Sequence, residues 1–284
     1  MSPAAWSILG GLVVVLLAVD LVVFARHHAP TLRESAIWSV GWVVLALVFG
    51  LVLWQWQGGQ AGSEYLTGYL LERSLSLDNV FVFAVILSYF AVPREMQPNV
   101  LGWGIALALL LRLVFILVGA ALLESFQVTF YLFGLLLLYT AYKLARHDDI
   151  QIEPERNPVL RLSRPVGIAS PLFAVFVVVA TTDLIFAIDS IPAIFAVTRE
   201  PFIVFAANAF AMLGLRALYF LLAGMRDRFV YLSQGLAAVL GFIGVKMLLV
   251  DLWHVPIWLS LAVVVITLAV AAALSVRASA RAAA

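Results

Sequence analysis

The sequence predicts an all-α, polytopic membrane protein of about nine transmembrane helices, with the N-terminus outside and the C-terminus inside. Of its 284 residues, 64% are hydrophobic and only 12% are charged, with a mean hydropathy of +1.09. Soluble domains are about 45–50% apolar and about 25% charged. The apolar residues also gather in runs of about 20, the length that spans a bilayer as a helix. Finally, ionisable residues recur in order along the chain, which indicates an inverted repeat.

Counting about 20 apolar residues per crossing gives the positions of the helices. The expected spans are Ala5–Phe24, Ala36–Trp54, Tyr69–Phe90, Val100–Leu123, Thr129–Leu144, Leu172–Val197, Ile203–Ala223, Tyr231–Val250 and Ile257–Val276. No basic residue precedes the first run, so we expect a retained helix there and not a cleaved signal. The third span is the most ambiguous, because its first half is polar.

The basic residues set the predicted orientation. With the N-terminus outside, 12 of the 17 lysines and arginines fall in cytoplasmic segments, and only Arg199 falls in an outer one. The remaining four (Arg73, Arg112, Arg216 and Lys246) lie inside spans. Such an excess on one side follows the positive-inside rule.

Ionisable landmarks inside the spans recur in the same order. Glu72 maps to Asp183 and Asp78 to Asp189 at an offset of 111, Arg112 to Arg216 at 104, and Lys143 to Lys246 at 103. Residues 68–145 and 171–250 are therefore interpreted as two copies of a three-helix unit. Three crossings per unit make the second copy inverted, an architecture that places a binding site at the midplane. Residues 146–170 form the predicted cytoplasmic loop, and 5–54 and 257–276 are flanking helices.

The two acid pairs are the predicted centre of function. A charged residue near the middle of a bilayer costs about 2.5 kcal/mol or more. Within each pair the spacing is six residues, which on a straight helix gives a rotation of about 240° and a rise of about 9 Å. The two acids of one pair therefore do not meet on one ion. Either the helix is broken, as Pro192 favours beside Asp189, or each half contributes one acid to a shared centre.

The residues around these acids are oxygen donors, and the chain has no cysteine. Carboxylate, amide and hydroxyl oxygens suit Mn²⁺, Mg²⁺ or Ca²⁺. The predicted metal ligands are Glu72, Asp78, Asn79, Asp183, Asp189 and Ser190. Additional candidates for ligands or gating are Asp20, Thr182, Asn208, Arg112 and Arg216. No prosthetic group is expected, because the metal ion would be the substrate.

A plainer interpretation is that the acids only pair with the buried bases to fix helix packing. For Arg112 and Arg216 this interpretation and a role as gating counter-charges are equally open. Asp20 lies near the inner end of its span, which favours a peripheral gate or cap. An intramembrane aspartyl protease is disfavoured, because the Gly-x-Gly-Asp motif is absent. We therefore expect no enzyme.

Three segments carry a resemblance to a known family: SLDNVFVFAVILSYFAVP, ATTDLIFAIDSIPAIFAVTREPFIVFAANAFAMLGLRALYFLL and FIGVKMLL. They resemble the TerC family of integral membrane proteins, which includes the Alx-type proteins and belongs to the LysE-like transporter superfamily. The resemblance runs from about Gly10 to Val276. The family is named for tellurium resistance, and several members are linked to manganese export. The resemblance implies that Mn²⁺ is the cargo. It also implies that the residues of the family's acidic motif are the six predicted ligands.

The resulting hypothesis is a divalent-cation exporter, with Mn²⁺ as the expected cargo, in the bacterial plasma membrane. It would use midplane carboxylates and alternating access. Its partners would be the lipid bilayer and the cation, with no nucleic acid. One alternative is a membrane scaffold or sensor that binds soluble tellurite-resistance or secretion proteins through the loop 146–170. The other is a LysE-like amino-acid exporter, in which an arginine would bind the substrate carboxylate.

Overall fold

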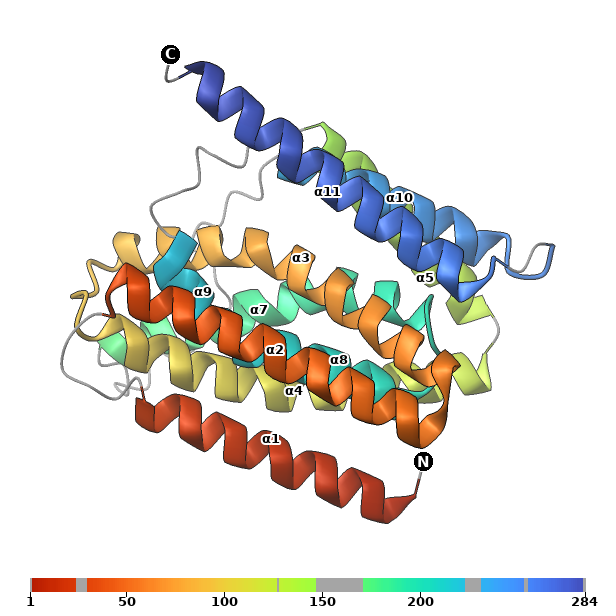
Figure 1. Ribbon diagram of the computed structural model, residues 1–284, viewed down its shortest axis with the longest axis horizontal. Coiled ribbons are helices and arrows are strands. Elements are labelled where there is room, and N and C mark those ends of the chain that lie inside the picture. Colours follow the sequence, from red (N-terminus) through yellow and green to blue (C-terminus); the bar gives the residue numbers. More distant parts are fainter. Residues whose placement is uncertain are drawn as a thin grey trace, which may run out of the picture.

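The computed structural model describes residues 2–23, 30–126, 128–146, 171–222, 231–252 and 255–282. Within these ranges the chain forms helices and no strand, which confirms the all-α prediction (Figure 1). The helices are α1 (Pro3–Val23), α2 (Leu32–Gln57), α3 (Gly59–Tyr89), α4 (Gln97–Ser125), α5 (Val128–Ala145), α7 (Pro171–Phe195), α8 (Pro201–Leu213), α9 (Leu215–Leu222), α10 (Leu232–Leu248) and α11 (Ile257–Ala282). The predicted loop 146–170, apart from its first residue, lies outside the described residues.

Local sequence signals account for several helix starts. Thr31 precedes α2 and accepts a hydrogen bond from the Glu34 amide, while the Glu34 carboxylate accepts one from the Thr31 amide. This reciprocal capping box satisfies two backbone donors that a helix start leaves unpaired. Both α4 and α8 begin with a proline in the first turn, where the missing N–H costs nothing.

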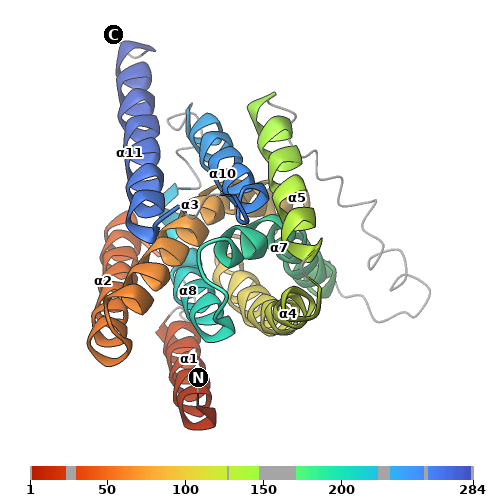
Figure 2. The ribbon, with the colours of Figure 1, turned by 90° about the vertical axis from the view of Figure 1, so that its right-hand side faces the viewer.

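The helix α8 forms the centre of the bundle. All of its residues from Phe202 to Leu213 are buried. It packs against α1, α2, α3, α4 and α7, and Figure 2 shows it surrounded by these helices. The helices α3 and α4 each contact both α7 and α8. Polar side chains on α3, α4, α7 and α8 are therefore directed into one shared interior.

The helices α5, α10 and α11 lie together at one side of this bundle (Figure 2). Contact between α5 and α10 depends on small residues. A Cβ at Gly244 would lie 2.9 Å from the carbonyl oxygen of Gly134, so only glycine allows the two backbones to come this close. Residues of α5 and α10 share a core with Leu71 of α3 and Ala193 of α7.

The described helices support a multi-pass membrane protein. Six of them are long and apolar enough to cross a bilayer, and a seventh span results if α8 and α9 are counted as one bent crossing. Each of the nine predicted spans falls on a helix or on this bent pair. However, α3 is more polar than a typical span, and α10, at 17 residues, is short.

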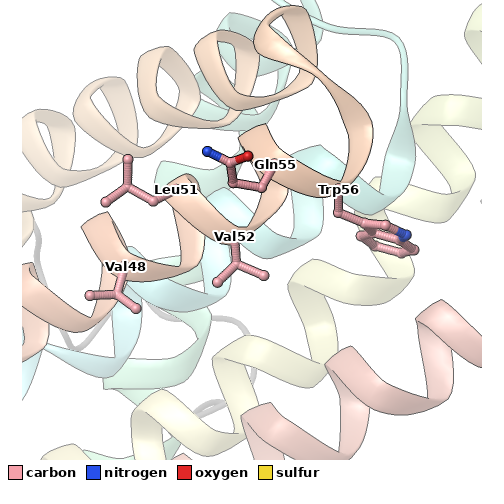
Figure 3. Close-up of a pocket in the computed structure, with 5 residues that line it drawn as sticks. All are labelled: Val48, Leu51, Val52, Gln55 and Trp56. Atoms are coloured by element: carbon pink, nitrogen blue, oxygen red, sulfur yellow. The ribbon is translucent and has the colours of Figure 1, made fainter.

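The outer surface of α2 carries one open hollow. An open hollow of about 440 Å³ is lined by Val48, Leu51, Val52, Gln55 and Trp56, all from this helix (Figure 3). None of these residues is charged. The hollow is therefore part of an apolar exterior and does not belong to the acidic interior.

The predicted helix break beside the acid pairs does not occur. The helix α3 runs without interruption through Glu72 and Asp78, and α7 runs through Pro192 to Phe195. A proline removes only one backbone hydrogen bond, and the packed neighbours of α7 keep the remaining turns helical. The break occurs instead at Gly214, where α8 and α9 meet at a bend of 42°. Of the two expected arrangements, only the one in which each half contributes an acid to a shared centre remains open.

Candidate functional site

The central polar cluster joins one acid from each predicted half. Glu72 lies on α3, Asp183 on α7, and both carboxylates bind the guanidinium of Arg112 on α4. Arg112 donates from Nε to Asp183 Oδ2 at 2.8 Å and from Nη1 to Glu72 Oε1. All three residues are essentially inaccessible: Glu72 and Arg112 are 0% exposed and Asp183 is 1% exposed. We call these three residues the Arg112 centre.

Two serines contact residues of the Arg112 centre. Ser76, one turn after Glu72, donates its hydroxyl to Glu72 Oε1 at 3.3 Å. Ser190 on α7 accepts a longer contact from Arg112 Nη1 at 3.4 Å. The predicted metal ligands Glu72, Asp183 and Ser190 are therefore brought together by the fold. Arg112, which the sequence left open between pairing and gating, lies between them as an ion-pair partner.

The charges of the Arg112 centre do not balance. Two carboxylates face one guanidinium, which leaves one formal negative charge in a buried space. Within the described part of the chain, Glu72 Oε2, Asp183 Oδ1 and Arg112 Nη2 have no hydrogen-bond partner. Buried charges are expensive unless they are paired, and orphaned acceptors add to that cost. Two carboxylate oxygens with spare capacity and an excess negative charge are suited to receive a cation.

The Arg112 centre is not a complete metal site by itself. No group of three or more His, Cys, Asp or Glu residues with metal-binding geometry occurs among the residues that the structure describes. The predicted ligand Asp78 lies on α3, but its side chain is outside the described part. A cation held between Glu72 and Asp183 therefore needs neutral oxygens to fill its remaining coordination positions.

The buried amide of Asn208 is the strongest such neutral candidate. Asn208 is 0% exposed on α8, and neither Oδ1 nor Nδ2 has a partner among the described atoms. Its neighbours fix its level in the bundle: Ala207 packs beside Gly68, and the carbonyl of Ala211 accepts from Arg73. Asn208 thus lies alongside the segment of α3 that carries Glu72. Asn79 and Thr182 are also buried, at 4% and 2% exposed.

Asp189 is separate from the Arg112 centre. It lies half-buried on α7 and accepts a hydrogen bond on Oδ1 from Thr140 Oγ1 of α5, at 2.8 Å. This partner was missed by the sequence interpretation. A polar threonine three residues before Lys143 was the available signal.

Asp20 forms a second buried ion pair, with Arg216. Arg216 on α9 donates through Nη2 to the carboxylate and the carbonyl of Asp20, and through Nη1 to the carbonyl of Pro98 at 3.1 Å. Asp20 is 2% exposed, because Arg216, next to the helix break at Gly214, reaches α1 across the first turn of α4. Its role as a peripheral gate or cap stays a prediction. We call Asp20 and Arg216 the Arg216 centre.

Arg73 was also missed as a structural residue. It adjoins Glu72 in sequence but points to α8, where Nη1 donates to the carbonyl oxygen of Ala211 at 2.9 Å. The last carbonyls of a helix have no intrahelical partner, so this contact caps α8 where it ends before Gly214. The charge of Arg73 thus stabilises the end of α8 at the bend.

Comparison with known proteins gives a consistent family. A model described as "Integral membrane protein TerC family" matches residues 57–283. An Escherichia coli protein named "Putative membrane-bound redox modulator Alx" is 42% identical, over 93% of this chain and 91% of its own length. Proteins named as uncharacterized membrane proteins are 42% identical in Myxococcus xanthus (93% and 89%) and 44% identical in Mycobacterium bovis (87% and 68%). No solved structure matches the chain.

Proposed function

The chain belongs to the TerC family of integral membrane proteins, as its motifs predicted, and we propose that it exports divalent cations, with Mn²⁺ as cargo, across the bacterial plasma membrane. The observation that carries the proposal is the Arg112 centre. Acids from two helices meet there with one negative charge in excess and two carboxylate oxygens unpartnered. An intramembrane ionisable cluster of this kind is costly to retain for packing alone.

In the proposed cycle, Arg112 is an internal counter-charge. Without substrate it neutralises part of the charge of Glu72 and Asp183. When a divalent cation arrives, Glu72 Oε2 and Asp183 Oδ1 bind it, with Asn208 as a neutral oxygen ligand. Arg112 is then repelled by the cation and loosens its contacts between α3, α4 and α7. This coupling of occupancy to helix packing is what alternating access requires.

The proposed architecture has nine crossings, N-out and C-in, with units 68–145 and 171–250 related as an inverted repeat. Packing supports the relation. The pair α3 with α8 has its counterpart in α7 with α4 when the units are exchanged. At finer scale, a Cβ at Gly244 would meet Leu138, and one at Gly241 would meet Ala141. At the offset of 103, Ala141 corresponds to Gly244 and Leu138 to Gly241. Each contact is therefore the counterpart of the other when the two units are exchanged.

The oxygen ligands limit the substrate to a class of metal ions, and the resemblance to the TerC family selects one ion within that class. Oxygen-only ligands favour Mn²⁺, Mg²⁺ and Ca²⁺ over softer metals. The choice of Mn²⁺ rests on the resemblance to the TerC family. Some relatives are named as redox modulators, but this chain has no cysteine. Any redox effect would therefore not come from thiol–disulfide exchange in the chain itself, and control of a metal pool is a simpler route.

The alternative of an amino-acid exporter is less well supported. It requires an arginine that is available for the substrate carboxylate, but Arg112 and Arg216 each bind carboxylates of the protein. The scaffold alternative relies on the loop 146–170, almost all of which lies outside the described residues.

Reconstitution tests the proposal. Purified protein in liposomes that contain a Mn²⁺-sensitive dye should give a protein-dependent signal when Mn²⁺ is added outside. Glu72→Gln and Asp183→Asn should each reduce the initial rate by at least about tenfold, since each removes a charge that holds the ion. Glu124→Gln is the matched control, because Glu124 is an exposed acid at the end of α4. No signal from the wild-type protein would exclude the function, and full activity of both variants would exclude the site.

A further inference from the structure

Asp189 has an environment of its own between α7 and α5. Thr140 Oγ1 donates to Asp189 Oδ1 at 2.8 Å, which fixes the orientation of the carboxylate. Lys143 lies on the same face of α5, one turn beyond Thr140, and interacts electrostatically with Asp189. All three residues are half-buried. This set contains a carboxylate, a hydroxyl that orients it and a tethered cation.

The same set lies next to the enclosed Arg112 centre. Asp189 follows Asp183 by about 9 Å along α7. Ser190, the residue beside Asp189, contacts Arg112 Nη1 at 3.4 Å. Asp183 is 1% exposed, whereas Asp189 is half-buried. Asp189 is therefore the less enclosed of the two acids of α7.

We propose that Asp189 and Thr140 form a second station for the divalent cation, with Lys143 as a resident counter-ion that the arriving cation displaces. This inference rests on the proposed function. Thr140 is a positioning residue, because it holds the carboxylate in one orientation. When no cation is bound, Lys143 partly neutralises Asp189 and so lowers the electrostatic free energy of the unoccupied station. For the same reason Lys143 competes with the substrate cation.

The other half of the molecule lacks this arrangement. With the offset of 103, Thr140 corresponds to Ile243, which is apolar and 1% exposed. Lys143 corresponds to Lys246, whose amine donates to Ser260 of α11 at 3.0 Å. At the position matched to Thr140, the other unit thus has an apolar side chain in place of a hydroxyl. The station gives the two ends of the pathway different affinities, which an inverted repeat of identical units would not have.

Transport kinetics in the same liposomes test the station through two variants of opposite sign. Thr140→Val keeps the shape of the side chain but removes the donor, and it should raise the KM for Mn²⁺ by about tenfold with little change in Vmax, since a hydrogen bond to a charged group is lost. Thr140→Ser should restore the wild-type KM. Lys143→Met removes the competing cation and should lower the KM.

The matched control is Thr129→Val, on the same helix. The Thr129 hydroxyl donates to the carbonyl of Leu122 and is not near an acid that the proposal uses. The variant should keep the wild-type KM. If Thr140 and Lys143 only stabilise the packing of α5, both variants will lose Vmax together with folded protein, and the station is wrong.

The outcome also separates this inference from the function on which it rests. If the wild-type protein transports Mn²⁺ and Glu72→Gln does not, but Thr140→Val and Lys143→Met keep the wild-type KM, only the second station fails. If the wild-type protein moves no Mn²⁺ at all, the proposed function itself fails, and the station fails with it. A rise in KM for Thr140→Val and a fall for Lys143→Met, with Thr129→Val unchanged, supports both.

Discussion

The two buried arginines occupy matched positions in the predicted repeat, yet the fold uses them differently. Arg112 on α4 and Arg216 on α9 are separated by the offset of 104, and both are 0% exposed. Arg112 binds two carboxylates, one from α3 and one from α7. Arg216 binds one carboxylate, Asp20, together with two backbone carbonyls. Among the described residues, two carboxylates therefore face Arg112 and one faces Arg216.

Under the proposed function, this difference distinguishes a cation site at the Arg112 centre from a structural lock, meaning an ion pair that only holds helices together, at the Arg216 centre. In both centres a carboxylate oxygen is left without a partner, so unpaired atoms alone do not distinguish them. The contacts of Arg216 with Asp20 and with the carbonyl of Pro98 tie α9 to α1 and α4. The Arg112 centre keeps an uncompensated charge that a substrate cation can neutralise. Under the proposed function, we therefore expect transport to depend on the Arg112 centre.

Removing Arg112 should have the largest effect on the molecule. Arg112→Met leaves two buried carboxylates without their partner, at a cost of about 3–5 kcal/mol in the free energy of unfolding. Arg216→Met leaves only one and should cost less. Unfolding by denaturant in mixed micelles measures both. Adding Glu72→Gln and Asp183→Asn to Arg112→Met should recover much of the loss. An equal cost for the two arginine variants would contradict the assigned charge difference.

Replacing aspartate by asparagine should reduce transport when it is done in the Arg112 centre and reduce stability when it is done in the Arg216 centre. Asp183→Asn leaves Arg112 paired with Glu72 and removes the surplus charge, so stability should change by about 1 kcal/mol or less while transport is lost. Asp20→Asn leaves Arg216 without a counter-charge and should cost about 2–3 kcal/mol, with the KM of the remaining folded protein unchanged. Thermal unfolding and Mn²⁺ transport are measured on the same preparations. Loss of transport by both variants in proportion to folded protein would show that both centres are structural.

The sequence was sufficient for the helices and for the acids that meet. The offset of 111 between Glu72 and Asp183 pointed to a shared centre, and these two residues do converge. Amphipathic or apolar patterns located all nine predicted helical segments, because burial in lipid demands long apolar runs. The first half of the third span, which lies on α3, was ambiguous because it contains polar residues. Some of these, Glu72 and Ser76 among them, are buried in the interior.

Contacts between distant helices could not be predicted in the same way. Nothing in the repeat relates Asp20 to Arg216, because α1 lies outside the repeated units. The choice of Arg112 as the bridge depends on how α4 sits between α3 and α7, which residue spacing does not encode. Proline was an unreliable guide to the helix break. Pro192 is accommodated within α7, whereas Gly214 and the cap from Arg73 end α8.

The packing around Arg216 offers a smaller test of the structural lock. A Cβ at Gly102 would lie 2.6 Å from Nη1 of Arg216 and 2.8 Å from Cδ2 of Leu21. Arg216 cannot withdraw without loosening its ion pair, so Gly102→Ala should cost about 1–3 kcal/mol. The KM for Mn²⁺ should not change. Gly41→Ala on α2 is the control, because its Cβ would meet no described atom within 4 Å. If Gly102→Ala is as benign as the control, the close contact with Arg216 does not support the lock.

The smallest expected change in stability is at Asn208, and its sign is the informative part. A buried amide without partners destabilises a fold, so Asn208→Leu, which keeps a similar volume, should raise the free energy of unfolding by about 1 kcal/mol. If the amide oxygen completes the coordination of a cation at the Arg112 centre, the same variant should raise the KM for Mn²⁺. A residue kept for packing would give loss of stability and an unchanged KM. Greater stability with weaker binding would mean that the fold carries a cost at Asn208 that only the bound ion relieves.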